Sequence, residues 1–393
     1  MQRSKLWFAL AAWVGGTLHA APVWQAGQVY QAGDTVTVAG VDYRAQWWTQ
    51  GQDPARHAGG LGGGQPWLVL DPDQPPLACG DVWRAGRAYA GNAVVSRHGR
   101  NYLAHWWTQG QDPEEVAHRE VWRDVGACRY VSDYQFTMVA RNVTALQFKG
   151  ETLSAAYRIH VKLPPDFQPD TAYPVLYVLD WALLGSVFTT QYQVLRDAGR
   201  IRPLIVVGVD CPDSALACDL RRSRDFSPTF WQAEEDYLQN TDPNLRISGG
   251  GPAFLTFLAD ELAPRIETHY LADATARGLH GTSMSGLFAS HALVARPDSF
   301  GRYLINSPSL WYDDYSLVTH AQTAPTASFA PVQRAFFSMG AEEGEPYLSD
   351  TAAFAALIGA KGVPVAAQVF PGRNHYSAAE VATEAGLLDS YPR

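Results

Sequence analysis

The chain has 393 residues with a formal net charge of −9 at pH 7, and 47% of the residues are hydrophobic. This length and composition are typical of a globular protein with more than one domain. The negative charge, without any run of basic residues, argues against nucleic acid or an anionic membrane as a partner. The cysteines lack a paired C-x₂-C pattern and the histidines are scattered, so we expect neither a metal site nor a cofactor.

The chain begins with a pattern typical of a signal peptide. A basic start, Met1–Lys5, precedes the apolar run Leu6–Leu18, and the small-residue motif Leu18-His19-Ala20 follows. The run is too short to span a bilayer comfortably, and no later segment is long and apolar enough to do so. We therefore expect residues 1–20 to be a cleaved signal peptide and the protein to be secreted, either to the periplasm or outside the cell.

The region after this segment contains an internal repeat in which equivalent residues, such as Trp24 and Trp83, lie 59 positions apart. The block WWTQGQDP at 47–54 recurs unchanged at 106–113. Each copy has about fifty residues with short alternating runs typical of strands. The repeat therefore predicts two small all-β modules, at residues 21–70 and 79–128.

Both copies resemble the chitin- and cellulose-binding modules of carbohydrate-binding family 5/12, through the pattern A-W…Y…G…V…G…Y-x-A-x-W-W-T-x-G-x-x-P. The resemblance implies chitin or a similar insoluble polysaccharide as a partner. Aromatic rings cover the apolar faces of sugars at little entropic cost. The candidate binding residues are Tyr43, Trp47, Trp48, Tyr102, Trp106 and Trp107.

Neighbouring residues on a strand point to opposite faces, so we expect one tryptophan of each adjacent pair in the core and the other exposed. The sequence does not say which. The alternative, in which the aromatic residues only form the module cores, stays open and is favoured for Trp24 and Trp83. The choice between chitin and cellulose also stays open.

Four cysteines fit the oxidising compartment that a signal peptide implies. Three pairings are formally possible. Cys79 and Cys128 bracket the second module, and Cys211 and Cys218 close a short loop, so we expect these two disulfides.

Residues 129–393 form one further domain, and its most informative segment is Gly281–Gly286, with the sequence GTSMSG. The segment lies between an apolar run and a helical pattern, as in a nucleophile elbow, where a sharp turn exposes a serine. Gly281 and Ser285 are both small, although Ser285 replaces the last glycine of the G-x-S-x-G pattern. Ser283 is therefore the candidate nucleophile.

A candidate acid and a candidate base follow in the chain order of α/β hydrolases. Glu342 and Glu343 come directly after a predicted buried strand that ends at Gly340, and His375 follows a second predicted strand. A histidine there takes the proton of Ser283, while a carboxylate orients it. Each residue alone is explained by a turn or a solvated loop, but their occurrence together and in order favours a catalytic triad.

The span from about Ala145 to the C-terminus resembles the putative esterase family of α/β hydrolases. That family includes enterochelin esterase-like proteins, S-formylglutathione hydrolases, and feruloyl and acetylxylan esterases. The matching segments are YRIHVKLPP at 157–165, YPVLYVLD at 173–180, RSRDFSP at 222–228, the elbow, SPSLW at 307–311, and the loops at Gly340 and His375.

The resemblance implies an α/β-hydrolase domain with a mixed, mostly parallel sheet flanked by helices. It also implies Glu343 as the acid, through the G-x-x-E spacing from Gly340, although Glu342 stays open. The backbone N–H groups of Met284 and Trp181 would form the oxyanion hole, and Trp181 stands where the family usually has glycine.

Together these features predict a secreted serine carboxyl-ester hydrolase that is tethered to polysaccharide by its modules. Its substrate would be a small acyl ester linked to carbohydrate, of the acetyl or feruloyl type. The alternative is a polysaccharide-binding protein with an inactive hydrolase-like domain, because Ser285 and Trp181 replace glycines.

Overall fold

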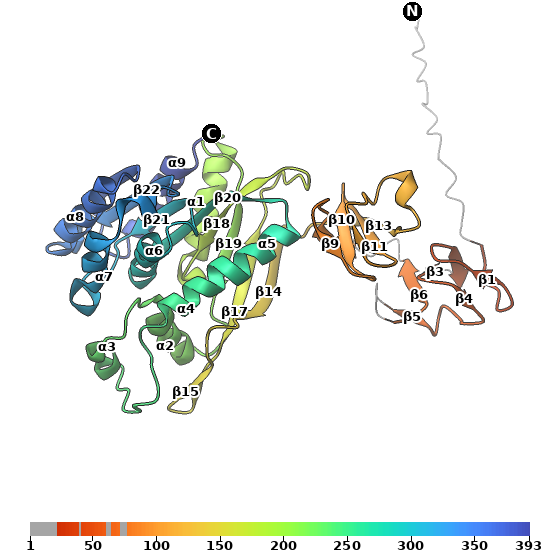
Figure 1. The fold of residues 1–393 in the computed structure, drawn as a ribbon, viewed down its shortest axis with the longest axis horizontal. Helices are drawn as coiled ribbons and strands as arrows, with labels where there is room; N and C mark the ends of the chain where they lie inside the picture. Colours follow the sequence, from red (N-terminus) through yellow and green to blue (C-terminus); the bar gives the residue numbers. More distant parts are fainter. Residues whose placement is uncertain (1–21, 39–40, 60–63, 71–76) are drawn as a thin grey trace, which may run out of the picture. The chain divides into compact units, whose positions relative to one another are not determined.

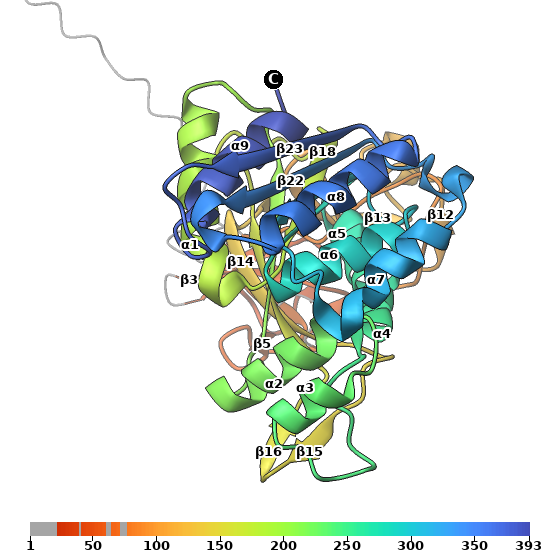
Figure 2. The ribbon, with the colours of Figure 1, turned by 90° about the vertical axis from the view of Figure 1, so that its left-hand side faces the viewer.

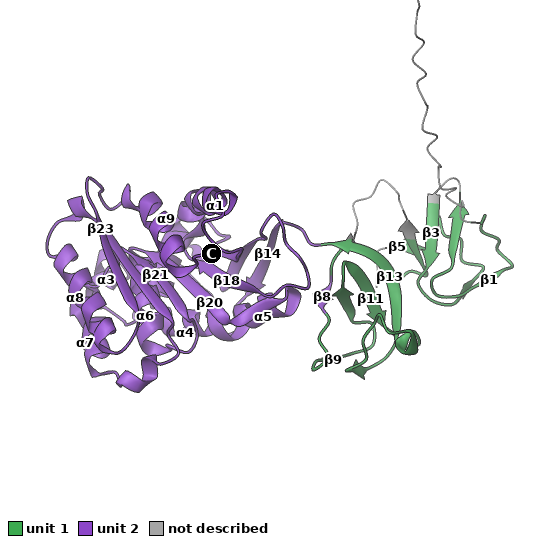
Figure 3. Cartoon of the chain, turned by 90° about the horizontal axis from the view of Figure 1, so that it is seen from above, with its two compact units in different colours: residues 1–79, 83–129 green, residues 80–82, 130–393 purple. Residues whose placement is uncertain are grey.

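The computed structural model describes residues 22–38, 41–59, 64–70 and 77–393, so the expected signal peptide at residues 1–20 lies outside the described residues. The chain divides into two compact units (Figure 3). The first consists of residues 1–79 and 83–129, and the second of residues 80–82 and 130–393. In the part of the chain that the structure describes, no helix combines the length and apolar character needed to cross a membrane.

The first unit contains both copies of the repeat, and each copy is built from short strands. In the first copy β1 pairs with β4, and a second sheet has the order β2-β3-β6-β5. In the second copy β9 pairs with β12, β11 lies between β10 and β13, and β7 pairs with β13. The bounds are β1 (Val29–Tyr30), β2 (Thr35–Val38), β3 (Val41–Ala45), β4 (Thr49–Gln50), β5 (Ala58–Gly59), β6 (Trp67–Leu70), β7 (Leu77–Ala78), β9 (Ala88–Tyr89), β10 (Val94–Arg97), β11 (Arg100–Ala104), β12 (Thr108–Gln109), a 3₁₀ turn η1 (Val116–His118) and β13 (Trp122–Arg129).

Equivalent tryptophans, Trp67 and Trp122, are buried in the cores of the two copies. The ring of Trp67 packs edge-on against Tyr30, with a centroid separation of 5.2 Å, and Trp122 packs in the same way against Tyr89 at 5.6 Å. The indole N–H of Trp67 donates to a backbone carbonyl at 2.7 Å, and that of Trp122 does so at 2.8 Å. Such small modules therefore depend on a few large aromatic side chains.

The second unit is a three-layer α/β domain (Figure 1). Its eight-stranded sheet has the order β14-β17-β19-β18-β20-β21-β22-β23, in which β14, β17 and β19 are antiparallel neighbours and the strands from β19 to β23 run parallel. The strand bounds are β14 (Asp133–Val139), β17 (Ala156–Lys162), β18 (Tyr173–Val178), β19 (Ile205–Asp210), β20 (Ala272–Thr282), β21 (Arg302–Asn306), β22 (Arg334–Gly340) and β23 (Val365–Phe370), with a hairpin of β15 (Leu146–Phe148) and β16 (Glu151–Leu153) and a short β8 (Asp81–Val82) outside it.

Helices cover both faces of this sheet because alternate residues of each central strand face opposite sides. In β18, Leu176 and Val178 pack under α1 and α9, whereas Val175 and Tyr177 belong to the core on the other face. Figure 2 shows α1 and α9 together on one side of the sheet and α6, α7 and α8 on the other. The helices are α1 (Trp181–Asp197), α2 (Ala215–Phe226), α3 (Gln232–Tyr237), α4 (Gly251–Thr256), a π-helical turn η2 (Phe257–Leu262), α5 (Ala263–His269), α6 (Met284–Ala295), α7 (Tyr312–Thr323), η3 (Thr326–Phe329), η4 (Ala341–Glu343), α8 (Tyr347–Ala360) and α9 (Ala378–Ser390).

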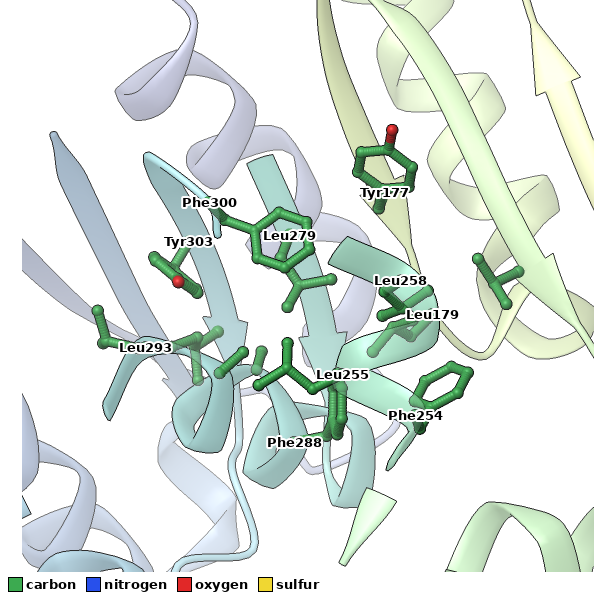
Figure 4. Packing of buried hydrophobic residues seen from close by; sticks show 14 of the residues in the cluster. Tyr177, Leu179, Phe254, Leu255, Leu258, Leu279, Phe288, Leu293, Phe300 and Tyr303 are labelled. Carbon is green, nitrogen blue, oxygen red and sulfur yellow. The ribbon is translucent and has the colours of Figure 1, made fainter. Parts of the chain in front are cut away.

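The larger core holds the central strands against the helices that follow the predicted elbow. Figure 4 shows side chains of the sheet packed with side chains of α4, η2 and α6, among them Tyr177, Leu179, Leu279, Phe254, Leu255, Leu258 and Phe288. All of these residues are almost fully buried. This packing fixes the position of the turn between β20 and α6, at the carboxyl end of the parallel strands.

Candidate functional site

The turn between β20 and α6 has the backbone geometry of a nucleophile elbow. Ser283 links the two elements with φ 62° and ψ −120°, a region that residues with a side chain seldom adopt. A Cβ atom added to Gly281 would lie 2.0 Å from the Ser285 carbonyl oxygen, so this position requires glycine. The local fold therefore depends on the small residues that the sequence has here.

Glu343 and His375 meet beside this turn. The 3₁₀ turn η4 follows β22 and directs Glu343 back toward the strand end, where its Oε2 accepts a hydrogen bond from His375 Nδ1 at 2.6 Å. Its other oxygen, Oε1, accepts from Ser307 Oγ at 2.7 Å and from the Gly340 N–H at 2.8 Å. The neighbouring Glu342 is exposed and makes no side-chain hydrogen bond among the described residues.

The contacts of Glu343 determine its charge. Burial raises the pKa of this carboxyl, but the hydrogen bonds from His375, Ser307 and the Gly340 N–H outweigh burial and hold the pKa below its ordinary value. Glu343 is therefore ionised at neutral pH and can balance a positive charge on His375. Ser307 was not singled out from the sequence, although it lies in the matching SPSLW segment.

Ser283, Glu343 and His375 line one cleft of about 430 Å³. No hydrogen bond joins Ser283 to His375 within the described part of the chain. In substrate-free hydrolases such contacts are often long and tighten only when substrate binds. Three aromatic side chains also line the cleft and are partly or largely exposed, namely Trp311, Tyr347 and Tyr376.

Met284 and Trp181 each occupy the first position of a helix, α6 and α1 respectively. A backbone N–H at that position has no acceptor within its own helix and is available to an anion. The side chain of Trp181 is buried against Gly208 of β19, where an added Cβ would lie 2.1 Å from the indole ring. The indole is absent from the residues that line the cleft, so the tryptophan is accommodated behind the sheet rather than in the site.

The expectation for the tryptophan pairs is wrong. Exposure is 40% for Trp47 and 56% for Trp48, and 52% for Trp106 and 63% for Trp107, so both members of each pair face solvent. The reason is that β3 ends at Ala45 and β11 ends at the equivalent alanine, which leaves each pair in a bend where strand alternation does not apply.

Tyr43 and Tyr102, by contrast, are buried in the cores of their modules, with exposures of 8% and 6%. Their ring faces are not available to stack on a sugar, so the interpretation of these two residues as binding residues is not supported. Of the two residues expected in the cores, Trp83 is buried and Trp24 is partly buried against the core of the first module.

Both expected disulfides are present, Cys79–Cys128 and Cys211–Cys218. The first links positions 49 residues apart and encloses the second module, whereas the first module has no cysteine. Structural disulfides are typical of proteins in oxidising compartments.

Comparisons with known proteins give the same architecture. The family model described as "Putative esterase" matches residues 150–378, and that of the carbohydrate-binding module family 5/12 matches residues 23–68 and 82–123. The ferri-bacillibactin esterase BesA of Bacillus subtilis is 30% identical over 185 residues, which cover 45% of this chain and 61% of that protein. A siderophore enterobactin esterase of Emericella nidulans is 30% identical over 223 residues, which cover 53% of this chain and 72% of the relative.

A crystal structure of the BES protein from Bacillus cereus has the same fold as the second unit. Its TM-score is 0.53 at 24% identity, over 68% of this chain and 99% of that one. With the sheet order and the elbow already described, the comparisons classify the second unit as an ester hydrolase of the α/β-hydrolase fold. The chain belongs to the putative esterase family, and it carries two carbohydrate-binding modules of family 5/12 ahead of the esterase domain.

Proposed function

We propose that the protein is a secreted serine esterase that uses Ser283, His375 and Glu343 as its catalytic triad and binds chitin or a related polysaccharide through its modules. The observation that carries the proposal is the 2.6 Å hydrogen bond between His375 and the buried Glu343, in the same cleft as a serine in a strained elbow. A histidine that is oriented by a carboxylate and shares a cleft with a serine is the arrangement that acyl transfer requires.

The reaction proceeds through an acyl-enzyme. Ser283 Oγ attacks the ester carbonyl carbon while His375 accepts its proton, and the backbone N–H groups of Met284 and Trp181 stabilise the oxyanion. The bond to the alcohol oxygen then breaks, and His375 returns the proton to the leaving alcohol. A water molecule attacks the acyl-enzyme by the same route and releases the carboxylic acid. Glu343 keeps the imidazole in the required tautomer throughout.

The side chains that line the cleft favour a substrate whose acyl group contains a flat ring. Trp311, Tyr347 and Tyr376 present aromatic surface beside Ser283, and such rings stack on one another and on sugar faces. We therefore favour a feruloyl-type ester on carbohydrate over an acetyl ester, because a flat acyl ring can stack on these side chains and an acetyl group has no ring to stack.

The modules hold the enzyme on its insoluble partner. Four exposed tryptophans in two bends, Trp47 with Trp48 and Trp106 with Trp107, provide the stacking surface. Because the modules lie on one chain, binding of one raises the local concentration of the other, and avidity exceeds the single affinity by roughly 10²–10⁴. Replacing both pairs by alanine is expected to abolish retention on chitin and leave hydrolysis of soluble esters unchanged.

The test is hydrolysis of p-nitrophenyl and feruloyl esters by wild type and by Ser283→Ala, with a pre-steady-state burst of p-nitrophenol as the sign of an acyl-enzyme. Loss of activity in Ser283→Ala supports the proposal. Activity in that variant contradicts the proposed nucleophile. If neither protein hydrolyses any ester while both bind chitin, the alternative of a non-catalytic binding protein replaces the proposal.

A second candidate substrate is the ester of a siderophore, because the two curated relatives described above are named for ferri-bacillibactin and enterobactin. The same triad would act on it. Hydrolysis of enterobactin and ferri-bacillibactin, compared by kcat/KM with feruloyl esters, decides between the two substrate classes.

A further inference from the structure

A buried side-chain contact joins the two turns that carry the proposed oxyanion donors. Ser285 directly follows Met284, and Asp180 directly precedes Trp181. The hydroxyl of Ser285 donates a hydrogen bond to Asp180 Oδ2 at 2.8 Å. The immediate neighbours of the two donor residues are therefore in direct contact, although they lie 105 positions apart in the sequence.

Asp180 is itself held firmly. It has the left-handed backbone conformation, with φ 53°, between β18 and α1. Its carboxylate accepts two hydrogen bonds from Arg222 of α2, both at 2.9 Å, and its side chain is only 8% exposed. A bidentate arginine–carboxylate pair of this kind fixes orientation as well as position. The turn that carries the Trp181 N–H is thus anchored to α2 on one side and to the elbow on the other.

Ser285 is equally fixed on the elbow side. It is fully buried, and its Oγ accepts from the Thr282 N–H at 2.9 Å and lies 2.8 Å from the Thr282 carbonyl oxygen. Its single hydroxyl thus contacts the elbow backbone and the carboxylate together. A glycine, the residue of the strict G-x-S-x-G pattern, could make neither contact.

We propose that Ser285 is a positioning residue that sets the spacing of the oxyanion hole by linking the elbow to Asp180. This inference rests on the proposed function, because it assigns a purpose to donors that matter only if Ser283 is the nucleophile. It explains why a residue that departs from the motif is compatible with activity: the serine supplies a contact that glycine lacks.

The expected effect is on the transition state rather than on substrate binding. Removal of an oxyanion donor lowers kcat by about 10²–10³, and a displacement of about 1 Å costs about 10²-fold. Loss of the Ser285 link loosens one donor without deleting it. We therefore expect Ser285→Ala and Ser285→Gly to lower kcat by about 10- to 100-fold, with KM within about threefold of wild type.

The matched control is Ser290→Ala. Ser290 lies in the same helix, is fully buried and donates one hydrogen bond, to the Gly286 carbonyl oxygen at 2.8 Å, but it does not contact Asp180. Ser290→Ala should lower the free energy of unfolding, as the loss of a buried serine hydroxyl does, but leave kcat unchanged. The second readout is the Ki of phenylboronic acid, whose tetrahedral serine adduct places an oxygen at the oxyanion site, and Ser285 variants should raise it in parallel with the loss of kcat.

A double variant separates positioning from general damage. If Ser285 acts through Asp180, Ser285→Ala combined with Asp180→Asn is no more impaired than the worse single variant. Thermal unfolding confirms that each variant is folded, and if Ser285→Ala does not fold, Ser285→Gly and Asp180→Asn carry the test.

Two results overturn the inference while the proposed function stands: Ser285 variants that keep wild-type kcat and Ki while Ser283→Ala is inactive, or an equal loss of kcat in Ser290→Ala. Activity in Ser283→Ala overturns the proposed function instead, and the proposed role of Ser285 is then excluded as well.

Discussion

Replacing Glu343 by glutamine tests the triad at the point where the geometry is most specific. Glu343 uses Oε1 for two donors, Ser307 and the Gly340 N–H, and Oε2 for His375 alone. A glutamine that keeps the two contacts of Oε1 must direct its amide N–H₂ toward His375. The opposite orientation sets that amide against the Gly340 N–H, a donor that cannot rotate away.

In the favoured orientation His375 Nδ1 has to accept a hydrogen bond, so the ring proton moves to Nε2. The imidazole can then no longer take the proton of Ser283. The corresponding change of carboxylate to amide in the serine protease triad lowers kcat about 10⁴-fold, and we expect a loss of similar size for Glu343→Gln. The fold should persist, because the two hydrogen bonds to Oε1 remain and the third, to His375, is only reversed in direction.

The assay is steady-state hydrolysis of the best p-nitrophenyl ester by wild type, Glu343→Gln and the matched control Glu342→Gln. Glu342 lines the same cleft, but its carboxylate does not contact His375. Because Glu342 is exposed, we expect Glu342→Gln to keep kcat within about threefold of wild type. The reasoning is refuted if Glu343→Gln stays within tenfold of wild type, or if Glu342→Gln is the more damaged variant.

Three other predictions concern stability and binding. Burial lowers the pKa of His280 to about 4, so the unfolded chain takes up a proton on this residue as pH falls below about 6.5 while the folded chain does not. Wild type should therefore lose about 2 kcal/mol more of its free energy of unfolding than His280→Leu between pH 7 and 4.5 in urea unfolding, and equal losses would contradict a buried, neutral His280. Replacing Cys79 and Cys128 by serine should destabilise the second module by about 4 kcal/mol in calorimetry, and an unchanged transition would contradict a stabilising disulfide. Trp106→Ala combined with Trp107→Ala should reduce retention on chitin to that of a single module with unchanged circular dichroism, and undiminished retention would exclude this pair from binding.

Much of the esterase domain follows from local rules. Small residues around Ser283 predict a tight strand-to-helix turn, and the order of serine, acid and histidine after successive strands predicts where parallel strands bring them together. The choice between Glu342 and Glu343 did not follow from the elements, because both lie in one 3₁₀ turn. Only the fold shows that the turn exposes the first carboxylate and directs the second to His375.

Other features could not be predicted locally, because they depend on the residue at which a strand ends or on contacts between residues far apart in the sequence. Alternation between core and surface requires both tryptophans of a pair to lie on a strand, but the strand before each pair ends three residues before the second tryptophan. Two strands, β19 and β20, and several helices lie between Asp180 and Ser285 in the sequence, and no local pattern reveals their contact. Its one signal in the sequence is the serine that stands in place of a motif glycine.

The most direct test of the account is hydrolysis of a panel of p-nitrophenyl and feruloyl esters by wild type and Ser283→Ala, each with and without suspended chitin. The account predicts activity in wild type only, a preference for aromatic acyl groups, and recovery of that activity in the chitin pellet. Equal hydrolysis by both proteins would contradict the assignment of Ser283 as the nucleophile, and activity left entirely in the supernatant would contradict tethering to chitin.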